Sequence, residues 1–182
     1  METEKDSEII KRILAGETGL FAEIVDKYGA PVLRMVKRIV SCNEEAEEVV
    51  QDIFLNAFRK LNTFKDKSEF STWLYRIAYN RAISATRKKK QQYSLFNETD
   101  ATNIPDETID YFFEDDKNEQ LIEKLQEKIE LLNPDEKALL TMFYLEKKSI
   151  NEISFIARIS VSNVKIKLFR IRKKLYLQLK IN

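Results

Sequence analysis

The 182 residues, 43% of them hydrophobic, allow one domain or two small ones, and 3 Gly and 3 Pro are too few for the turns of a β-rich fold. A net charge of +1 argues against a generic nucleic-acid binder, and a chain with no His and one Cys cannot form His-dependent catalytic triads, internal disulfides or the usual zinc sites. Without a signal core or a long apolar run, we expect a cytoplasmic protein with no membrane insertion, no cofactor, no metal and no enzymatic activity.

Four helices are expected in the N-terminal part of the chain. Apolar residues recur there at helical spacing, which predicts helices at 7–16, 18–41, 44–61 and 70–90. Gly16 ends the first helix, and Pro31 either kinks the second or, together with Gly29, splits it. Asn43 is the expected N-cap of the third helix. Residues 62–69 are expected to form a loop.

The helical pattern stops after Lys90 and returns near residue 118. Four more helices are predicted, at 118–132, 135–146, 150–157 and 161–180. Asn133, Ser149 and Ser160 are their expected N-caps. The fold class is therefore all-α. Two small helical domains, at 1–91 and 118–182, are expected to be joined by a flexible acidic linker at 92–117.

The charges are unevenly distributed along the chain. Residues 76–90 hold six Arg or Lys and no acid, and residues 158–182 hold eight and no acid. Between them, residues 98–119 hold nine acids and one Lys. The small net charge therefore conceals two basic segments that can contact nucleic acid.

The C-terminal segment has the pattern of a helix-turn-helix, with the turn at residues 158–160. In its second helix, apolar residues at helical spacing face inward, and the remaining positions face outward or flank that face. The outward and flanking residues are Ser162, Asn163, Lys165, Ile166, Lys167, Phe169, Arg170 and Lys173. A helix of this kind reads base edges in a major groove. The alternative is a solvated basic face, which the absence of acids over 25 residues argues against.

The segment at residues 70–90 combines basic and aromatic side chains. That combination suits single-stranded or melting DNA, because every base offers a face for stacking. Core packing is the alternative for Trp73, and a solvated helix end is the alternative for the basic run at residues 87–90.

Two stretches resemble a known family. AEEVVQDIFLNAFRKLNTF at 46–64, followed by FSTWLYRIAYNRAI at 70–83, resembles region 2 of the extracytoplasmic-function group of the RNA polymerase sigma-70 family. Residues 131–175 resemble region 4, in the expected order and at the expected spacing. The family usually has Gly in the turn of the helix-turn-helix, where the backbone is left-handed. Arg158 stands there in this chain, at an expected cost of about 1 kcal/mol.

The resemblance implies a sigma factor that binds core polymerase, recognises the −10 and −35 promoter elements and promotes DNA melting. The residues it implies for core binding are Glu48, Gln51, Asp52 and Leu55. Those implied for the −10 element are Phe64, Lys65, Arg76, Asn80, Arg81, Arg87 and Lys88, although Phe64 is equally compatible with the core. A base flipped from the non-template strand would enter the 62–69 loop.

The resemblance also implies the partners. The recognition helix, 161–173, would read the −35 element, and the chain would be a monomer when free. The expected partners are the β and β′ subunits of core RNA polymerase, promoter DNA and an anti-sigma factor. The acidic linker would thread toward the polymerase active-site cleft; the alternative is a plain solvated tether.

Three other functions fit the sequence less well. A dimeric helix-turn-helix repressor or activator does not explain the basic and aromatic segment at 70–90 or the acidic linker. The chain has no His and no Gly-rich phosphate loop, which argues against a nucleotide-processing enzyme. The two basic segments argue against an adaptor or anti-sigma protein that binds only protein.

Overall fold

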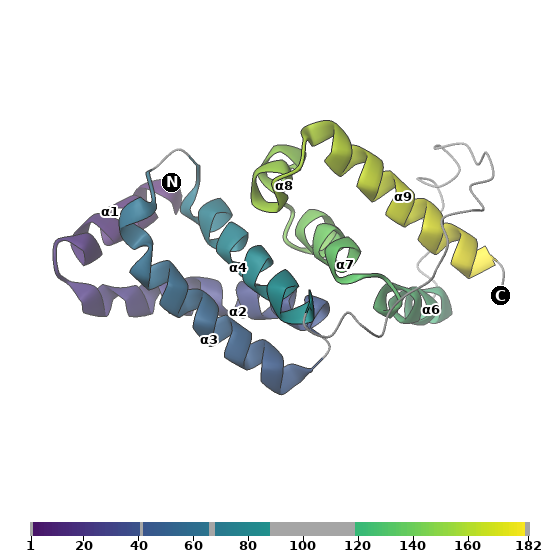
Figure 1. The fold of residues 1–182 in the computed structure, drawn as a ribbon, viewed down its shortest axis with the longest axis horizontal. Coiled ribbons are helices and arrows are strands. Elements are labelled where there is room, and N and C mark those ends of the chain that lie inside the picture. The colour runs from purple at the N-terminus through teal and green to yellow at the C-terminus, as the bar shows by residue number, and fades with distance from the viewer. Residues whose placement is uncertain (1, 41, 66–67, 88–118, 181–182) are drawn as a thin grey trace.

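The chain folds into helices on either side of one interface (Figure 1). The structure is a computed structural model that describes residues 2–40, 42–65, 68–87 and 119–180. The N-terminal half holds α1 (Glu2–Leu14), the 3-10 turn η1 (Thr18–Leu20), α2 (Phe21–Ile39), α3 (Asn43–Arg59), the 3-10 turn η2 (Leu61–Thr63) and α4 (Phe70–Arg87). The C-terminal half holds α6 (Glu119–Glu130), α7 (Pro134–Leu140), the π-helix η4 (Thr141–Leu145), α8 (Ile150–Ala157) and α9 (Val161–Lys180). The all-α fold class is confirmed, whereas the predicted linker at 92–117 lies outside the described residues.

The first helix is longer at its start than predicted. It begins at Glu2 rather than at residue 7, because Glu and Lys propagate a helix without contributing apolar periodicity. It ends at Leu14, and Gly16 follows with φ 119°, a conformation that a side chain would strain. The next helix starts only at Phe21, since residues 18–20 form the tighter 3-10 turn.

The second helix runs through Pro31 without a break. Pro removes one backbone hydrogen bond, yet one face of α2 buries six side chains and packs on α3, α4 and α7. This burial outweighs the local cost, so the alternative of a split helix is wrong. The buried residues are Ile24, Tyr28, Val32, Met35, Val36 and Ile39.

Asn43 is not the N-cap of the third helix. It is already helical, and Cys42 occupies the cap position without a capping hydrogen bond from its side chain. The Cys42 thiol instead donates to Glu44 Oε2 at 3.0 Å. Glu44 and Glu45 still occupy the first turn, where the positive end of the helix dipole stabilises carboxylates.

The three predicted caps of the C-terminal half are confirmed. Asn133 and Ser149 each accept from the backbone N–H three residues on and form complete capping boxes with Glu136 and Glu152. Ser160 Oγ accepts from the N–H of Asn163 at 3.2 Å. The expected helix at 135–146 differs in kind, because α7 gives way at Thr141 to the wider turns of η4.

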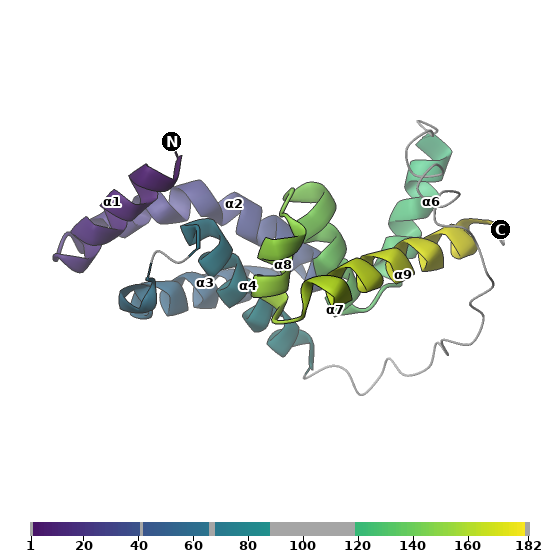
Figure 2. The same cartoon turned by 90° about the horizontal axis from the view of Figure 1, so that it is seen from above.

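The two halves share one continuous hydrophobic core. α7 packs on α2, and α8 packs on α4, so buried side chains of both halves form a single cluster. Figure 2 shows α8 lying across α4 and α9 extending away from the N-terminal half. No helix within the described ranges is long and apolar enough to cross a bilayer.

Candidate nucleic-acid interface

A groove of about 570 Å³ lies beside α4 and brings together most of the residues predicted for the −10 element. Its lining residues come from the end of α3, from η2 and the start of the following loop, from α4, and from the C-terminal end of α8 with the turn after it. Phe64, Lys65, Arg76, Asn80 and Arg81 all line it. Arg87 is exposed further along α4, and Lys88 lies outside the described residues.

The groove is strongly cationic. Among the described residues that line it, five are Lys or Arg and none is acidic: Lys60, Lys65, Arg76, Arg81 and Arg158. Partial burial, together with the neighbouring Arg158 guanidinium, lowers the pKa of Arg76. Such a concentration of positive charge in a concave surface attracts a polyanion.

Aromatic rings form the apolar part of the groove. Phe64 lies edge-on to Phe70, with ring centroids 5.4 Å apart, and its centroid is 5.7 Å from that of Trp73. Phe64 and Trp73 are only partly buried and pack against the core. The two alternatives for these residues are therefore not exclusive, because each ring contacts the core and also lines the groove.

Polar contacts fix the orientation of two of these side chains. The Asn80 amide donates to the Arg76 carbonyl at 2.7 Å, along the same helix. Arg81 forms an ion pair with Asp52 of α3. Asp52, predicted to bind polymerase, therefore contacts a residue predicted to bind DNA.

The recognition helix exposes the side chains predicted for the −35 element. Ser162, Asn163, Lys165, Ile166, Lys167 and Arg170 are exposed, and Phe169 and Lys173 are half-buried. Their opposite face is buried through Val164, Leu168, Ile171 and Leu175, as predicted. The turn before this helix has Arg158 at φ 57° and ψ 42°, the expected left-handed conformation.

The predicted polymerase face lies on α3, away from the C-terminal half. Glu48, Gln51 and Leu55 are exposed there, and Leu55 has 54% of its surface accessible to solvent. Phe58, one turn further on, is 39% exposed. Exposed large apolar side chains on a helix face mark a surface suited to a protein partner.

Phe155 and Lys60 are among the groove residues that sequence analysis missed. The Arg76 guanidinium lies 4.7 Å from the centroid of the Phe155 ring, across the interface between the two halves. Phe155 looked like an ordinary residue of a short amphipathic helix, and no local pattern places that helix beside α4. Lys60 directly precedes the turn η2, and its position just before the predicted 62–69 loop was the available signal.

Family models match both parts of the chain. The model for sigma-70 region 2 matches residues 24–92, and the model for sigma-70 region 4 matches residues 122–175. Two solved structures are similar in fold. CnrH in complex with the cytosolic domain of CnrY has a TM-score of 0.65 and 18% identity, with 96% of each chain covered. RpoE in complex with the anti-sigma factor NepR from Bartonella quintana has a TM-score of 0.61 and 19% identity, with 89% of this chain and 98% of that chain covered.

Curated relatives match over nearly the whole length. The ECF RNA polymerase sigma factor SigW of Bacillus subtilis (strain 168) is 32% identical, with 94% of this chain and 95% of the relative covered. The ECF RNA polymerase sigma-E factor of Escherichia coli (strain K12) is 29% identical, with 92% and 91% covered. With both regions matched in order, the chain belongs to the extracytoplasmic-function sigma factors of the sigma-70 family, which act in transcription initiation.

Proposed function

We propose that this sigma factor binds core RNA polymerase through α3, reads the −35 element with α9 and holds the separated −10 strand in the groove beside α4. The observation that carries the proposal is the groove itself, where cationic side chains and accessible aromatic rings from η2 and α4 line one concave surface. Cations neutralise phosphates, and exposed ring faces stack on unpaired bases, so the groove suits a single strand.

The exposed face of α9 supports duplex reading. Lys165 and Arg170 project from the N-terminal half of the helix, where side chains reach base edges in a major groove. Ser162 and Asn163 are exposed in its first turn and can hydrogen-bond bases or phosphates. We assign this helix to the −35 element and its half-buried Lys173 to the phosphate backbone.

Because the −10 groove and the −35 helix are assigned to different parts of the chain, we infer two functional units with separate tasks. We propose residues 1–91 as the unit for core binding and −10 melting, residues 92–117 as an acidic linker, and residues 118–182 as the −35 unit. The protein would act in the cytoplasm, as a monomer when free, and contact the β and β′ subunits. Its catalytic chemistry would be that of the polymerase. An anti-sigma factor is a further proposed partner, since one of the two similar solved structures is a sigma factor in complex with the anti-sigma factor NepR.

Transcription with purified core polymerase and a promoter library tests the proposal. We expect promoter-specific starts that require the chain. Lys165→Ala or Arg170→Ala should each weaken discrimination at one −35 position by roughly tenfold, because a good base contact contributes about 1–3 kcal/mol. Binding to core polymerase should remain unchanged.

Lys124→Ala is the matched control, since it removes an exposed lysine from α6 rather than from α9. It should leave promoter choice intact. Leu55→Asp should show the opposite pattern, with loss of core binding and retained affinity for −35 duplex. If no specific start appears while the chain alone binds duplex DNA tightly, a polymerase-independent repressor or activator is the correct assignment.

A further inference from the structure

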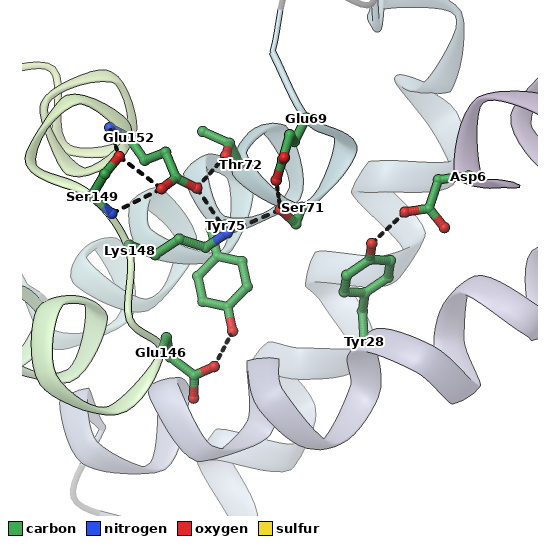
Figure 3. Close-up of polar contacts among 10 residues, drawn as sticks. All are labelled: Asp6, Tyr28, Glu69, Ser71, Thr72, Tyr75, Glu146, Lys148, Ser149 and Glu152. Carbon is green, nitrogen blue, oxygen red and sulfur yellow. Dashed lines mark hydrogen bonds and ion pairs between the residues drawn. The ribbon is translucent and has the colours of Figure 1, made fainter. Parts of the chain in front are cut away.

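Polar side chains connect the two halves at several points along α4 (Figure 3). Tyr75 donates to Glu146 at 2.7 Å, and Glu146 also lies 3.6 Å from the Arg34 guanidinium of α2. One helical turn further along α4, Tyr79 donates to Asp135 at 2.9 Å. Burial and the facing carboxylates raise the pKa of both tyrosines, so both hydroxyls remain donors.

A lysine and a glutamate at the start of α8 extend these contacts. The Lys148 ammonium donates to Ser71 at 2.9 Å and to Glu152 at 3.0 Å. Glu152 also accepts from Thr72 at 3.0 Å. Only 12% of the Lys148 side chain is exposed, so its charge is satisfied by partners from both halves. We call this set the docking network: Arg34, Ser71, Thr72, Tyr75, Tyr79, Asp135, Glu146, Lys148 and Glu152.

The backbone between α7 and α8 presents the network to α4. The π-helix η4 ends just before Glu146, and Lys147 follows with φ 49°, an uncommon conformation for a residue with a side chain. This reversal brings Glu146 and Lys148 to neighbouring points on α4 (Figure 3). The strain is retained because the surrounding contacts determine the local geometry.

Docking also places part of the helix-turn-helix in the groove. Phe155 and Arg158 line the groove, and Phe155 covers one face of the Arg76 guanidinium at 4.7 Å. A base or phosphate that approaches Arg76 therefore competes with the C-terminal half. By contrast, the exposed faces of α9 and α3 remain open in the same conformation.

We propose that the free chain closes on itself through the docking network, and that closure partly obstructs the −10 groove by covering one face of Arg76, while the −35 helix and the polymerase face stay accessible. The effect of closure on the −10 groove rests on the function proposed above. Undocking returns the polar network groups to water, and it also separates apolar side chains that the two halves bury together. Polymerase binding opens the closed state only if its contacts to the open state outweigh both costs.

The test removes network contacts without touching the groove. Tyr75→Phe with Tyr79→Phe deletes two hydrogen bonds to carboxylates and keeps both rings, and neither tyrosine lines the groove. We expect the closed-to-open ratio to fall by at least about tenfold. Lys148→Glu is the stronger variant, because it places a second carboxylate beside Glu152.

Tyr28→Phe is the matched control. The Tyr28 hydroxyl donates to Asp6 at 2.5 Å, a buried tyrosine–carboxylate contact that lies wholly within the N-terminal half. It should leave closure unchanged. Circular dichroism at the working temperature confirms that every variant used is folded.

Closure is measured between spin labels on Glu23→Cys of α2 and Asn151→Cys of α8 in a Cys42→Ser background, since both labelled positions are exposed. We expect one narrow distance distribution for the parent and for Tyr28→Phe, and a longer, broader population for the double variant and Lys148→Glu. A broad distribution in the parent overturns the closed state, and an unchanged narrow one in both network variants overturns the role of the docking network in holding it.

Binding of a fluorescent −10 non-template oligonucleotide tests the block on the groove. The network variants should bind it about tenfold more tightly, with affinity for −35 duplex unchanged. Arg76→Ala separates this inference from the proposed function. If Arg76→Ala weakens binding but the network variants do not strengthen it, the block is wrong. If Arg76→Ala has no effect either, the assignment of the groove itself fails.

Discussion

Arg158 occupies a backbone position that favours glycine. Its φ of 57° places Cβ close to the following carbonyl, at a cost of about 1 kcal/mol relative to Gly. The adjacent guanidiniums of Arg158 and Arg76 add a repulsion across the interface, and burial first and this repulsion second lower the pKa of Arg76. The residue is therefore unfavourable both to the turn and to docking.

Arg158→Gly should consequently raise the free energy of unfolding by about 1 kcal/mol, measured by urea denaturation. Arg158→Ala is the control, because it removes the same charge but keeps Cβ in the left-handed region. Lys147→Gly, at φ 49°, relieves the same kind of strain at a second turn and should give a similar gain. Equal stabilisation by Gly and Ala at 158 would attribute the effect to charge instead of backbone strain.

At the scale of the element, α8 depends on its capping box. Burial alone would raise the pKa of Glu152, but hydrogen bonds from the Ser149 backbone and hydroxyl and from Lys148 outweigh it and lower the pKa to about 2. The ordinary value is 4.5. Because the folded-state pKa is the lower one, Glu152 stabilises the fold fully above about pH 4.5, and the stabilisation is lost as the pH falls toward 2.

Glu152→Gln should thus destabilise the chain most at neutral pH, by about 1 kcal/mol, with the difference from the parent narrowing below pH 4.5. Denaturant titrations at a series of pH values measure it. Glu127→Gln, on an exposed position of α6, is the matched control and should cost less. A difference that widens on acidification would contradict the assignment of the low pKa to Glu152.

Elements with local signals could be predicted, and elements shaped by tertiary contacts could not. The caps at Asn133, Ser149 and Ser160 and the buried face of α9 follow from side-chain chemistry and spacing alone. The continuity of α2 through Pro31 and the π-helix η4 do not, because packing decides them.

The same division applies to the candidate site. The basic and aromatic residues of α4 were visible in sequence, and the structure gathers Arg76, Asn80 and Arg81 with Phe64 and Lys65. The contribution of Phe155 was not visible. It depends on how α8 docks on α4, a contact between residues about eighty positions apart.

At the scale of the whole molecule, sequence charge is segregated rather than balanced. The net charge of +1 conceals two basic segments and an acidic stretch between them. Long-range repulsion between that stretch and DNA would limit non-specific binding, while short-range contacts at α9 and the groove remain available.

Replacing Glu114, Asp115 and Asp116 with amides should therefore raise affinity for random duplex DNA. The net charge becomes +4, because three negative charges are removed from +1. The same change at Glu8, Glu23 and Asp26, exposed on α1 and α2, is the matched control and should have less effect. Fluorescence anisotropy at low salt measures the difference, which should vanish near 1 M salt, where the Debye length is about 3 Å. Equal gains from both sets would mean that only total charge matters.

Trp73 gives the groove an intrinsic optical signal. It is the only tryptophan in the chain, it lines the groove, and its indole lies against Phe64 and Phe70. Excitation that is selective for the indole avoids the seven tyrosines, so the emission reports only on the surroundings of Trp73. A base stacking in the groove would quench this emission, and withdrawal of Phe155 would shift it to longer wavelength by admitting water. The unlabelled protein can thus distinguish an empty open groove from an occupied one during promoter melting.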